Sequence, residues 1–163
     1  MLRDSTIMIR KAVGAIVFRG EKYLLVGKVK LMEIPNGPVE IPLEWHIPRG
    51  GVIASDESNI DATERELREE TDSKRFRIIR ELENKLCFIF PLDIQEKTGF
   101  EKQETVMFLV EYIGTGDDLS PIDEEISRVE FVTKEVLFQR ILVKETREYF
   151  RETLDHLSFL IGI

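Results

Sequence analysis

The chain has 163 residues, with 31 acidic side chains against 23 Lys and Arg, so its formal net charge is −8. That length predicts one domain over residues 1–163, and the 42% hydrophobic content is enough for a sizeable core. The acidic balance argues against a basic nucleic-acid-coating module and against a polybasic membrane binder. A polyanionic ligand would therefore need local Arg and Lys side chains, or bound cations, to overcome the global charge.

The chain contains one cysteine, Cys87, which therefore has no partner for an internal disulfide. Cys87 lies in the apolar run 86–90, where we expect a buried structural thiol. No apolar stretch approaches the roughly 18 residues of a transmembrane helix, and residues 1–11 lack the apolar centre of a signal peptide. These features predict a cytoplasmic protein that makes no membrane contact.

The first half of the chain predicts a hairpin, a loop and a helix. Apolar residues 12–18 and 23–27 predict two strands joined by a tight turn. Residues 31–44 contain three prolines and predict an irregular loop. A helix is predicted over residues 59–71, because Ser58 before it is a favourable N-cap residue.

The second half predicts further strands followed by two helices. Residues 93–103 are polar and predict a surface loop. The predicted strands are residues 76–82, 86–90, 105–112 and 126–132. The predicted helices are residues 136–141 and 145–157. Strands with one central and one terminal helical block indicate an α+β layered fold and not a regular βαβ repeat.

The most informative segment is acidic, with seven carboxylates from Glu57 to Asp72. Glu66 has Glu69 and Glu70 three and four residues later, so the three side chains share one helix face. Like charges at these spacings repel. The face is therefore either simply solvated or a site for a divalent cation, and crowded carboxylate oxygens suit Mg²⁺ or Mn²⁺.

The spacing of these acids resembles a known motif. Gly51 is followed after five residues by Glu57 and, after seven more, by Arg-Glu-Leu-Arg-Glu-Glu at residues 65–70. This pattern resembles the Nudix box of hydrolases that act on nucleoside-diphosphate-linked compounds. Asp72 stands where that family has Gly, and Ser73 where it has an aliphatic residue. Because Asp tolerates the left-handed conformation, we expect the helix still to end at Asp72.

The resemblance extends over about residues 10–155. Residues 45–51, Trp-His-Ile-Pro-Arg-Gly-Gly, are similar to a segment of the Nudix branch that cleaves dinucleoside polyphosphates and 5′-triphosphorylated RNA ends. One residue is inserted between the glycine pair and Glu57, and the Gln-Lys-Trp-Phe signature of that branch is absent. The resemblance implies a Nudix-type α/β/α sandwich with a mixed central sheet.

The resemblance also implies a metal site. Glu66, Glu69, Glu70 and Glu125 are expected to hold one to three divalent cations, Mg²⁺ or Mn²⁺. Glu66, Glu69 and Glu125 are the predicted catalytic residues. Nudix branches differ in which acid is the general base, so both Glu66 and Glu125 are candidates. Glu124 takes the place of Glu125 if the alignment shifts by one residue.

Other residues of the motif have structural or substrate-binding predictions. Arg65 is expected to brace the loop before the helix through Glu57, in preference to binding phosphate. The predicted substrate-binding residues are Trp45, Arg49, Gly50 and Gly51. For Trp45, stacking on a base and supporting a strand are both open. His46 and His156 show no metal-ligand spacing and are predicted to be surface or packing residues.

The predicted function is a Mg²⁺-dependent pyrophosphohydrolase that cleaves a phosphoanhydride bond of a nucleoside diphosphate-linked substrate. The resemblance favours a (di)nucleoside polyphosphate such as diadenosine tetraphosphate. Alternatives are an RNA 5′ end, and a nucleoside triphosphate or ADP-sugar. Two alternatives from other classes are a nucleotide-binding regulatory domain and an acidic interaction protein. The motif carboxylates are all present, which favours the enzyme, while the oligomeric state stays open.

Overall fold

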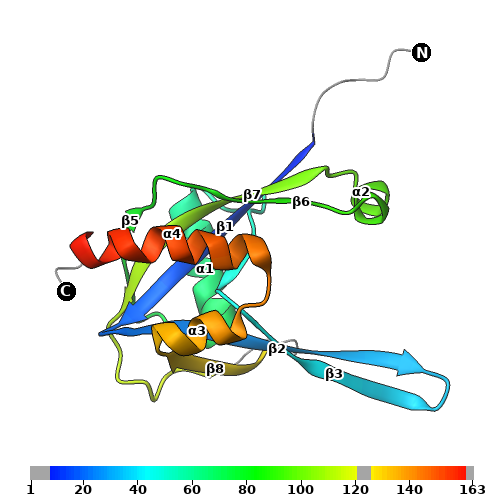
Figure 1. Cartoon of the computed structure of the whole chain (residues 1–163), viewed down its shortest axis with the longest axis horizontal. Helices are drawn as coiled ribbons and strands as arrows, with labels where there is room; N and C mark the ends of the chain where they lie inside the picture. Colours follow the sequence, from blue (N-terminus) through cyan, green and yellow to red (C-terminus); the bar gives the residue numbers. More distant parts are fainter. Residues whose placement is uncertain (1–7, 121–125, 161–163) are drawn as a thin grey trace.

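The computed structural model describes residues 8–120 and 126–160. These residues form eight strands and four helices (Figure 1). In chain order they are β1 (Ile9–Arg19), β2 (Lys22–Ile34), β3 (Gly37–His46), β4 (Arg49–Gly51), α1 (Asn59–Thr71), β5 (Phe76–Glu81), β6 (Leu86–Ile89), α2 (Leu92–Thr98), β7 (Lys102–Tyr112), β8 (Ile126–Val132), α3 (Lys134–Arg140) and α4 (Lys144–Leu160).

The strands form a mixed sheet with the order β3-β2-β1-β7-β5. Strands β1 and β7 pair in parallel, from Ile9 opposite Lys102 to Phe18 opposite Glu111. The other pairings are antiparallel, with β4 on β1, β6 on β7 and β8 on β2. The predicted α+β class and mixed sheet are therefore confirmed.

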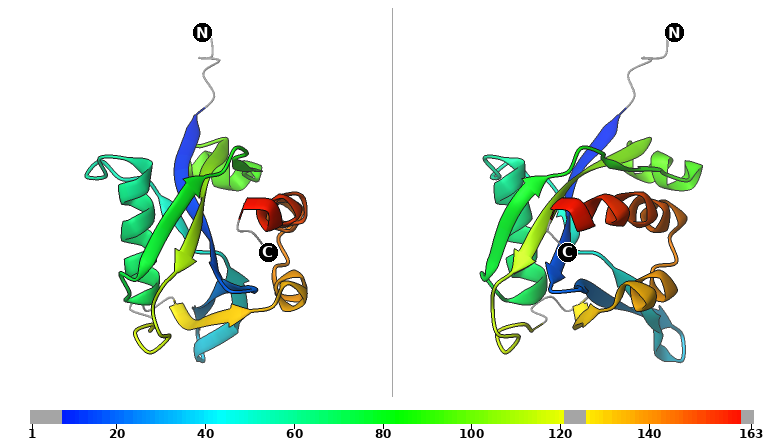
Figure 2. Two further views of the ribbon diagram at one scale, coloured as in Figure 1. Left: turned by 90° about the vertical axis from the view of Figure 1, so that its left-hand side faces the viewer. Right: turned by 60° about the vertical axis from the view of Figure 1, so that its left-hand side comes forward.

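Helices cover both faces of the sheet. Helix α1 lies on one face, and α3 and α4 lie on the other (Figure 2). Alternate residues of β1 supply the two cores, because successive side chains of a strand point to opposite faces. Val13 and Val17 pack in one cluster with Leu67 of α1. Ile16 packs in the other with Phe150 of α4, which completes the predicted α/β/α sandwich.

The prediction of an irregular loop over residues 31–44 is wrong. Strand β2 continues to Ile34 and turns through two residues into β3, with Ile34 opposite Gly37. Proline is tolerated within β3 because this strand is the edge of the sheet, where a missing N–H costs no ladder hydrogen bond. The prolines therefore mark an edge strand and its turn.

The predicted surface loop over residues 93–103 is also partly wrong. Residues Leu92–Thr98 form the short helix α2, which ends at Gly99 in the left-handed conformation. Strand β7 then begins at Lys102, so only a few residues connect the two elements. A seven-residue polar helix lacks the apolar periodicity that identifies longer helices.

Cys87 is exposed, in contrast to the predicted buried thiol. It lies in β6, where Leu86 is buried and Phe88 is half-buried. Because side chains alternate between the two faces of a strand, Cys87 points away from the face that these neighbours cover. An apolar run in an edge segment need not be buried on both sides.

Helix α1 begins and ends where the sequence predicts. The Ser58 hydroxyl accepts a hydrogen bond from the Asp61 N–H at 3.1 Å, as expected of an N-cap. Asp72 adopts the left-handed conformation with φ of 60°, and its N–H donates to the Arg68 carbonyl. Asp72 therefore ends the helix in the left-handed conformation that glycine commonly adopts at this position.

The second departure from the motif, Ser73, is explained by a buried polar cluster. The Ser73 hydroxyl donates to Asp118, which also accepts from the Tyr112 hydroxyl. The Arg75 N–H donates to Ser73 Oγ at 3.1 Å. These contacts hold the loop after β7 against the end of α1, and they give the buried Ser73 hydroxyl its hydrogen-bond partners.

Replacing Ser73 with Ala is expected to destabilise the fold by about 1–3 kcal/mol, because it removes a buried hydrogen bond to a carboxylate. Thermal unfolding of Ser73→Ala against the wild type measures the effect. Ser55→Ala is the matched control, since Ser55 is exposed, and its stability should stay within about 0.5 kcal/mol of wild type. Equal unfolding temperatures for the two variants would contradict the structural role of Ser73.

Candidate active site

The candidate site forms where β4 meets α1. A Cβ atom placed on Gly50 would lie 2.1 Å from the carboxyl carbon of Glu66. The Glu66 carboxylate therefore rests directly on the Gly50 backbone, a closeness that only glycine permits. Packing of α1 beside β4 sets this contact.

Arg65 holds the loop between β4 and α1, but through a different acid from the one predicted. Its guanidinium makes two 3.0 Å contacts with the Asp56 carboxylate and a 2.9 Å hydrogen bond to the Gly51 carbonyl. Glu57 is exposed, and no ion pair in the described part of the chain joins it to Arg65. The Arg65 guanidinium lowers the pKa of Asp56.

The inserted residue explains the change of partner. Counted from Gly50 and not from Gly51, five residues separate the glycine from Asp56. Asp56 therefore takes the place that the motif gives to its first glutamate, and the prediction that Glu57 braces Arg65 is wrong. The bracing role of Arg65 itself is supported by these contacts.

Arg65 also reaches two of the predicted metal-binding carboxylates. Its Nη1 lies 2.8 Å from Glu66 Oε1 and 3.4 Å from Glu69 Oε2. The Glu69 side chain is 53% exposed, whereas that of Glu66 is 14% exposed. Glu66 therefore faces β4, and Glu69 lies at the rim of the site.

Glu70 is the most deeply buried of the three acids on the helix face. Only 4% of the residue is exposed, and its Oε2 atom has no hydrogen-bond partner. Its Oε1 atom lies 4.0 Å from the Lys28 Nζ atom. Burial raises the pKa of Glu70 to about 8, although Lys28 opposes the shift.

A divalent cation fits these acids. Within residues 8–120 and 126–160, no three His, Cys, Asp or Glu side chains form a ready metal cluster. Mg²⁺, however, is commonly held by one or two carboxylates, with water and substrate phosphates as the other ligands. Glu66 and Glu70 lie one helical turn apart, and the partnerless oxygen of Glu70 suits that role. Glu125 and its alternative Glu124 lie outside the described residues.

The metal-free protein is expected to lose stability as the pH rises from about 4.5 to about 8. The raised pKa means that folded Glu70 holds its proton more tightly than the unfolded chain does. This stabilisation is complete at low pH and disappears as the pH passes the folded pKa. Thermal unfolding in a chelator at pH 5 and pH 8 measures the loss.

Glu70→Gln is the control for this pH dependence. The variant cannot titrate at this position, so its unfolding temperature should fall less between the two pH values. Saturating Mg²⁺ should restore the wild type at pH 8, because a ligand of the folded state stabilises it. The same pH dependence in both proteins would contradict the assignment to Glu70.

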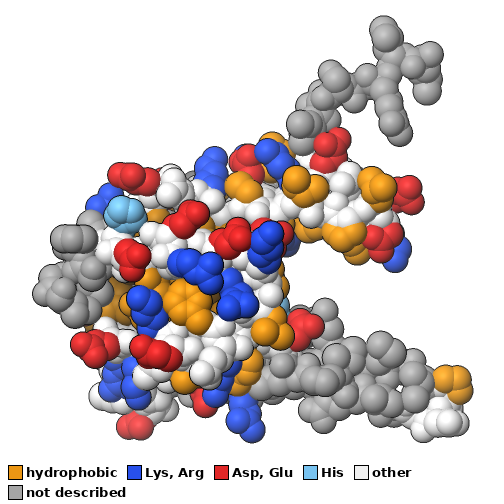
Figure 3. Space-filling model, viewed as in Figure 1, with side chains coloured by type: hydrophobic (Ala, Val, Ile, Leu, Met, Phe, Trp, Pro, Cys, Tyr) orange, Lys and Arg blue, Asp and Glu red, His pale blue; other side chains and the backbone are white. Residues whose placement is uncertain are grey.

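A cavity of about 430 Å³ opens beside Gly50. The surface is hollowed on this side of the molecule, next to the arm that carries α2 (Figure 3). Its lining includes three cationic side chains, two aromatic rings and one carboxylate. The cationic side chains are Arg10, Lys28 and Arg49, the rings are those of Phe88 and Phe90, and the carboxylate is that of Glu145. In a protein of net charge −8, this cluster is a local concentration of positive charge that could bind an anionic group.

The sequence prediction missed Arg10, Lys28 and Phe88. They come from β1, β2 and β6, and the sheet brings them together from distant parts of the chain. Arg10 is held by a hydrogen bond to Gln103, and the Arg49 guanidinium carbon lies 5.3 Å from the centre of the Phe88 ring. A single basic residue in a strand carries no signal that separates it from an ordinary surface residue.

Trp45 lies under a basic side chain. The guanidinium carbon of Arg140 is 4.2 Å from the centre of its ring, and Arg140 also pairs with Glu130 at 2.7 Å. The half-buried ring packs against the core cluster that contains Ile47 and Leu137. Of the two alternatives for Trp45, these contacts support a role in holding the strand.

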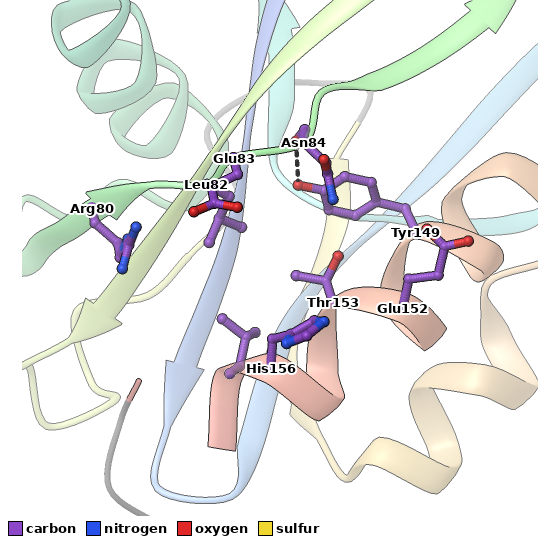
Figure 4. A pocket seen from close by; sticks show the side chains of 9 residues that line it. Arg80, Leu82, Glu83, Asn84, Tyr149, Glu152, Thr153 and His156 are labelled. Atoms are coloured by element: carbon purple, nitrogen blue, oxygen red, sulfur yellow. Dashed lines mark hydrogen bonds between the residues drawn. The ribbon is translucent and has the colours of Figure 1, made fainter. Parts of the chain in front are cut away.

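A second and larger cavity, of about 600 Å³, lies between the β5–β6 connection and α4. Figure 4 shows its polar lining, including Arg80, Glu83 and His156, and the hydrogen bond from the Tyr149 hydroxyl to the Asn84 carbonyl. None of the predicted catalytic or substrate-binding residues lines it. The larger of these two cavities is therefore not the one beside the predicted catalytic and substrate-binding residues.

The Glu66 carboxylate, packed on Gly50, and the cationic cavity beside it form the candidate active site. A match to the NUDIX domain family covers residues 8–154. The chain therefore belongs to the Nudix family, as its sequence motif predicts. Members of this family use divalent metal ions, in agreement with the carboxylate site on α1.

Two curated relatives from the genus Bartonella carry the name RNA pyrophosphohydrolase. The chain is 30% identical over 138 residues to the RNA pyrophosphohydrolase of Bartonella bacilliformis, a match that covers 80% of this chain and 78% of that protein. It is 36% identical over 89 residues to the RNA pyrophosphohydrolase of Bartonella tribocorum, covering 55% of this chain and only 50% of that protein. The names of these relatives agree with the predicted class of pyrophosphate-bond hydrolase.

Solved structures share the fold. An Ap4A hydrolase of C. elegans, in a binary complex, superposes with a TM-score of 0.64 at 19% identity, covering 94% of this chain and 99% of that one. This likeness confirms the predicted Nudix-type sandwich.

No helix in the described part of the chain is both long and apolar enough to cross a membrane.

Proposed function

We propose that the chain is a Mg²⁺- or Mn²⁺-dependent pyrophosphohydrolase that cleaves a phosphoanhydride bond of a nucleoside 5′-polyphosphate group. The observation that carries this proposal is the position of Glu66 and Glu70 beside a cavity with three cationic side chains. The acids are suited to a divalent cation, and Arg10, Lys28 and Arg49 to phosphate oxygens.

Two substrate classes share this chemistry. The names of the Bartonella relatives favour an RNA 5′ end, and we place that substrate first. A dinucleoside polyphosphate such as diadenosine tetraphosphate, favoured by the motif alone, is the second candidate. Both present to the cavity a polyphosphate chain that is attached to a nucleoside at its 5′ oxygen.

Each residue has a distinct role in this proposal. Arg10, Lys28 and Arg49 bind the non-bridging oxygens and orient the phosphate chain. Glu66 and Glu70 would hold a divalent cation, which would supply charge neutralisation and activation of a water molecule. Arg65 donates a hydrogen bond to Glu66 Oε1, so we assign Oε2 to the cation or, with Glu66 as the general base, to the proton of the attacking water. Glu125 is the alternative base.

The test is release of phosphate or pyrophosphate from a panel of substrates with and without Mg²⁺. The panel contains 5′-triphosphorylated RNA, diadenosine tetraphosphate, nucleoside triphosphates and ADP-ribose. We expect turnover of the RNA to exceed that of the other compounds, and EDTA to abolish it. Binding of nucleotide without metal, and no turnover of any compound, would instead indicate a regulatory domain.

A further inference from the structure

His46 lies behind the cationic cavity and contacts one of its arginines. Its Nδ1 atom is 3.4 Å from Arg49 Nη2, and its Nε2 atom is 3.3 Å from Glu44 Oε2. A guanidinium can only donate, so Nδ1 must be the accepting nitrogen. Nε2 then carries the hydrogen and donates to the Glu44 carboxylate.

The surroundings keep this imidazole neutral. Burial and the nearby positive charges of Arg49 and Lys28 lower the pKa of His46 to about 4, although Glu44 opposes the shift. The side chain is 15% exposed. A neutral ring is the form that accepts a hydrogen bond from Arg49, so the contact is available at neutral pH.

Arg49 is held on a second side by an aromatic ring. Its guanidinium carbon lies 5.3 Å from the centre of Phe88, and the residue lines the cavity. His46 does not line the cavity. Two supports on one long side chain reduce the number of rotamers that substrate binding must remove.

We propose that His46 is a positioning residue that fixes the Arg49 guanidinium toward the phosphate cavity, with Glu44 fixing the tautomer. This inference rests on the proposed function, because it takes Arg49 as a phosphate contact. It replaces the sequence-based expectation that His46 is only a surface or packing residue. Glu44 and His46 lie at the end of β3 and Arg49 lies at the start of β4, so the contacts link these two strands.

The test is a double-mutant cycle with His46→Leu, Arg49→Ala and the double variant. KM and kcat are measured on the substrate found in the panel, and binding of inorganic tripolyphosphate is measured by calorimetry. His46→Leu should raise KM and weaken tripolyphosphate binding by about 3–10-fold, the range for one lost hydrogen bond. It should leave kcat within about twofold and add nothing in the Arg49→Ala background.

Two further variants separate positioning from packing. His46→Asn keeps an acceptor near the Nδ1 position and should restore most of the lost affinity. Glu44→Ala changes an exposed residue and should raise KM by about twofold through the loss of one weak contact, even if His46→Leu folds poorly.

The outcomes distinguish this inference from the proposed function. If the wild type neither hydrolyses the panel nor binds tripolyphosphate, both fail together. If the wild type is active, unchanged KM in His46→Leu and Glu44→Ala overturns the positioning role alone. Losses that add fully to that of Arg49→Ala overturn it as well.

Discussion

Replacing Glu66 with Gln is expected to lower kcat by about 10²–10⁴-fold, the range for loss of a catalytic acid or base. The variant keeps the size of the side chain and its contact with Gly50, but it loses the negative charge. The variant therefore loses the carboxylate that would bind a divalent cation and that could accept the proton of the attacking water. Steady-state kinetics at saturating Mg²⁺ measure the effect, and thermal unfolding shows whether the fold is retained.

Glu69→Gln and Glu64→Gln are the matched controls on the same helix. Glu69 is half exposed and lies at the rim beside Arg65, so we expect a loss of about tenfold or less. Glu64 is exposed, and its replacement should be silent. Turnover by Glu66→Gln close to that of wild type would contradict the assignment of this residue to the reaction.

The extent to which the sequence predicts this protein depends on how local each feature is. Helix α1 was predicted to the residue, because Ser58 and Asp72 fix its ends through contacts within one turn. The motif on that helix identifies the family for the same reason. Its side chains are brought together by helical periodicity alone, which the sequence displays directly.

Features that depend on distant pairing were less predictable. The β2–β3 hairpin is stabilised by strand pairing, and its prolines suit only an edge, a position that the local sequence does not reveal. The partner of Arg65 changed because one inserted residue moved the bracing acid to Asp56. The cationic cavity draws Arg10 and Lys28 from separate strands, and only the folded sheet shows that they meet.

Replacing Gly50 with Ala is expected to reduce kcat/KM by about 100-fold or more while leaving most of the stability in place. The new methyl group would lie 2.1 Å from the Glu66 carboxyl carbon, so this carboxylate must move. The end of a glutamate side chain is flexible and can move at small cost to the fold. A shift of about 1 Å in a catalytic group, however, is sufficient to cost two orders of magnitude in rate.

Gly51→Ala is the matched control, because it displaces a different side chain. Its methyl group would lie 2.6 Å from Arg10 Nη2, which contacts phosphate in the proposed function and does not hold the cation. We therefore expect Gly51→Ala to act mainly on KM and Gly50→Ala mainly on kcat. If the Gly50 effect passes through Glu66, adding Gly50→Ala to Glu66→Gln should cause little further loss. If the losses caused by Gly50→Ala and Glu66→Gln add fully in the double variant, Gly50 affects the reaction through contact with the substrate and not through the Glu66 carboxylate.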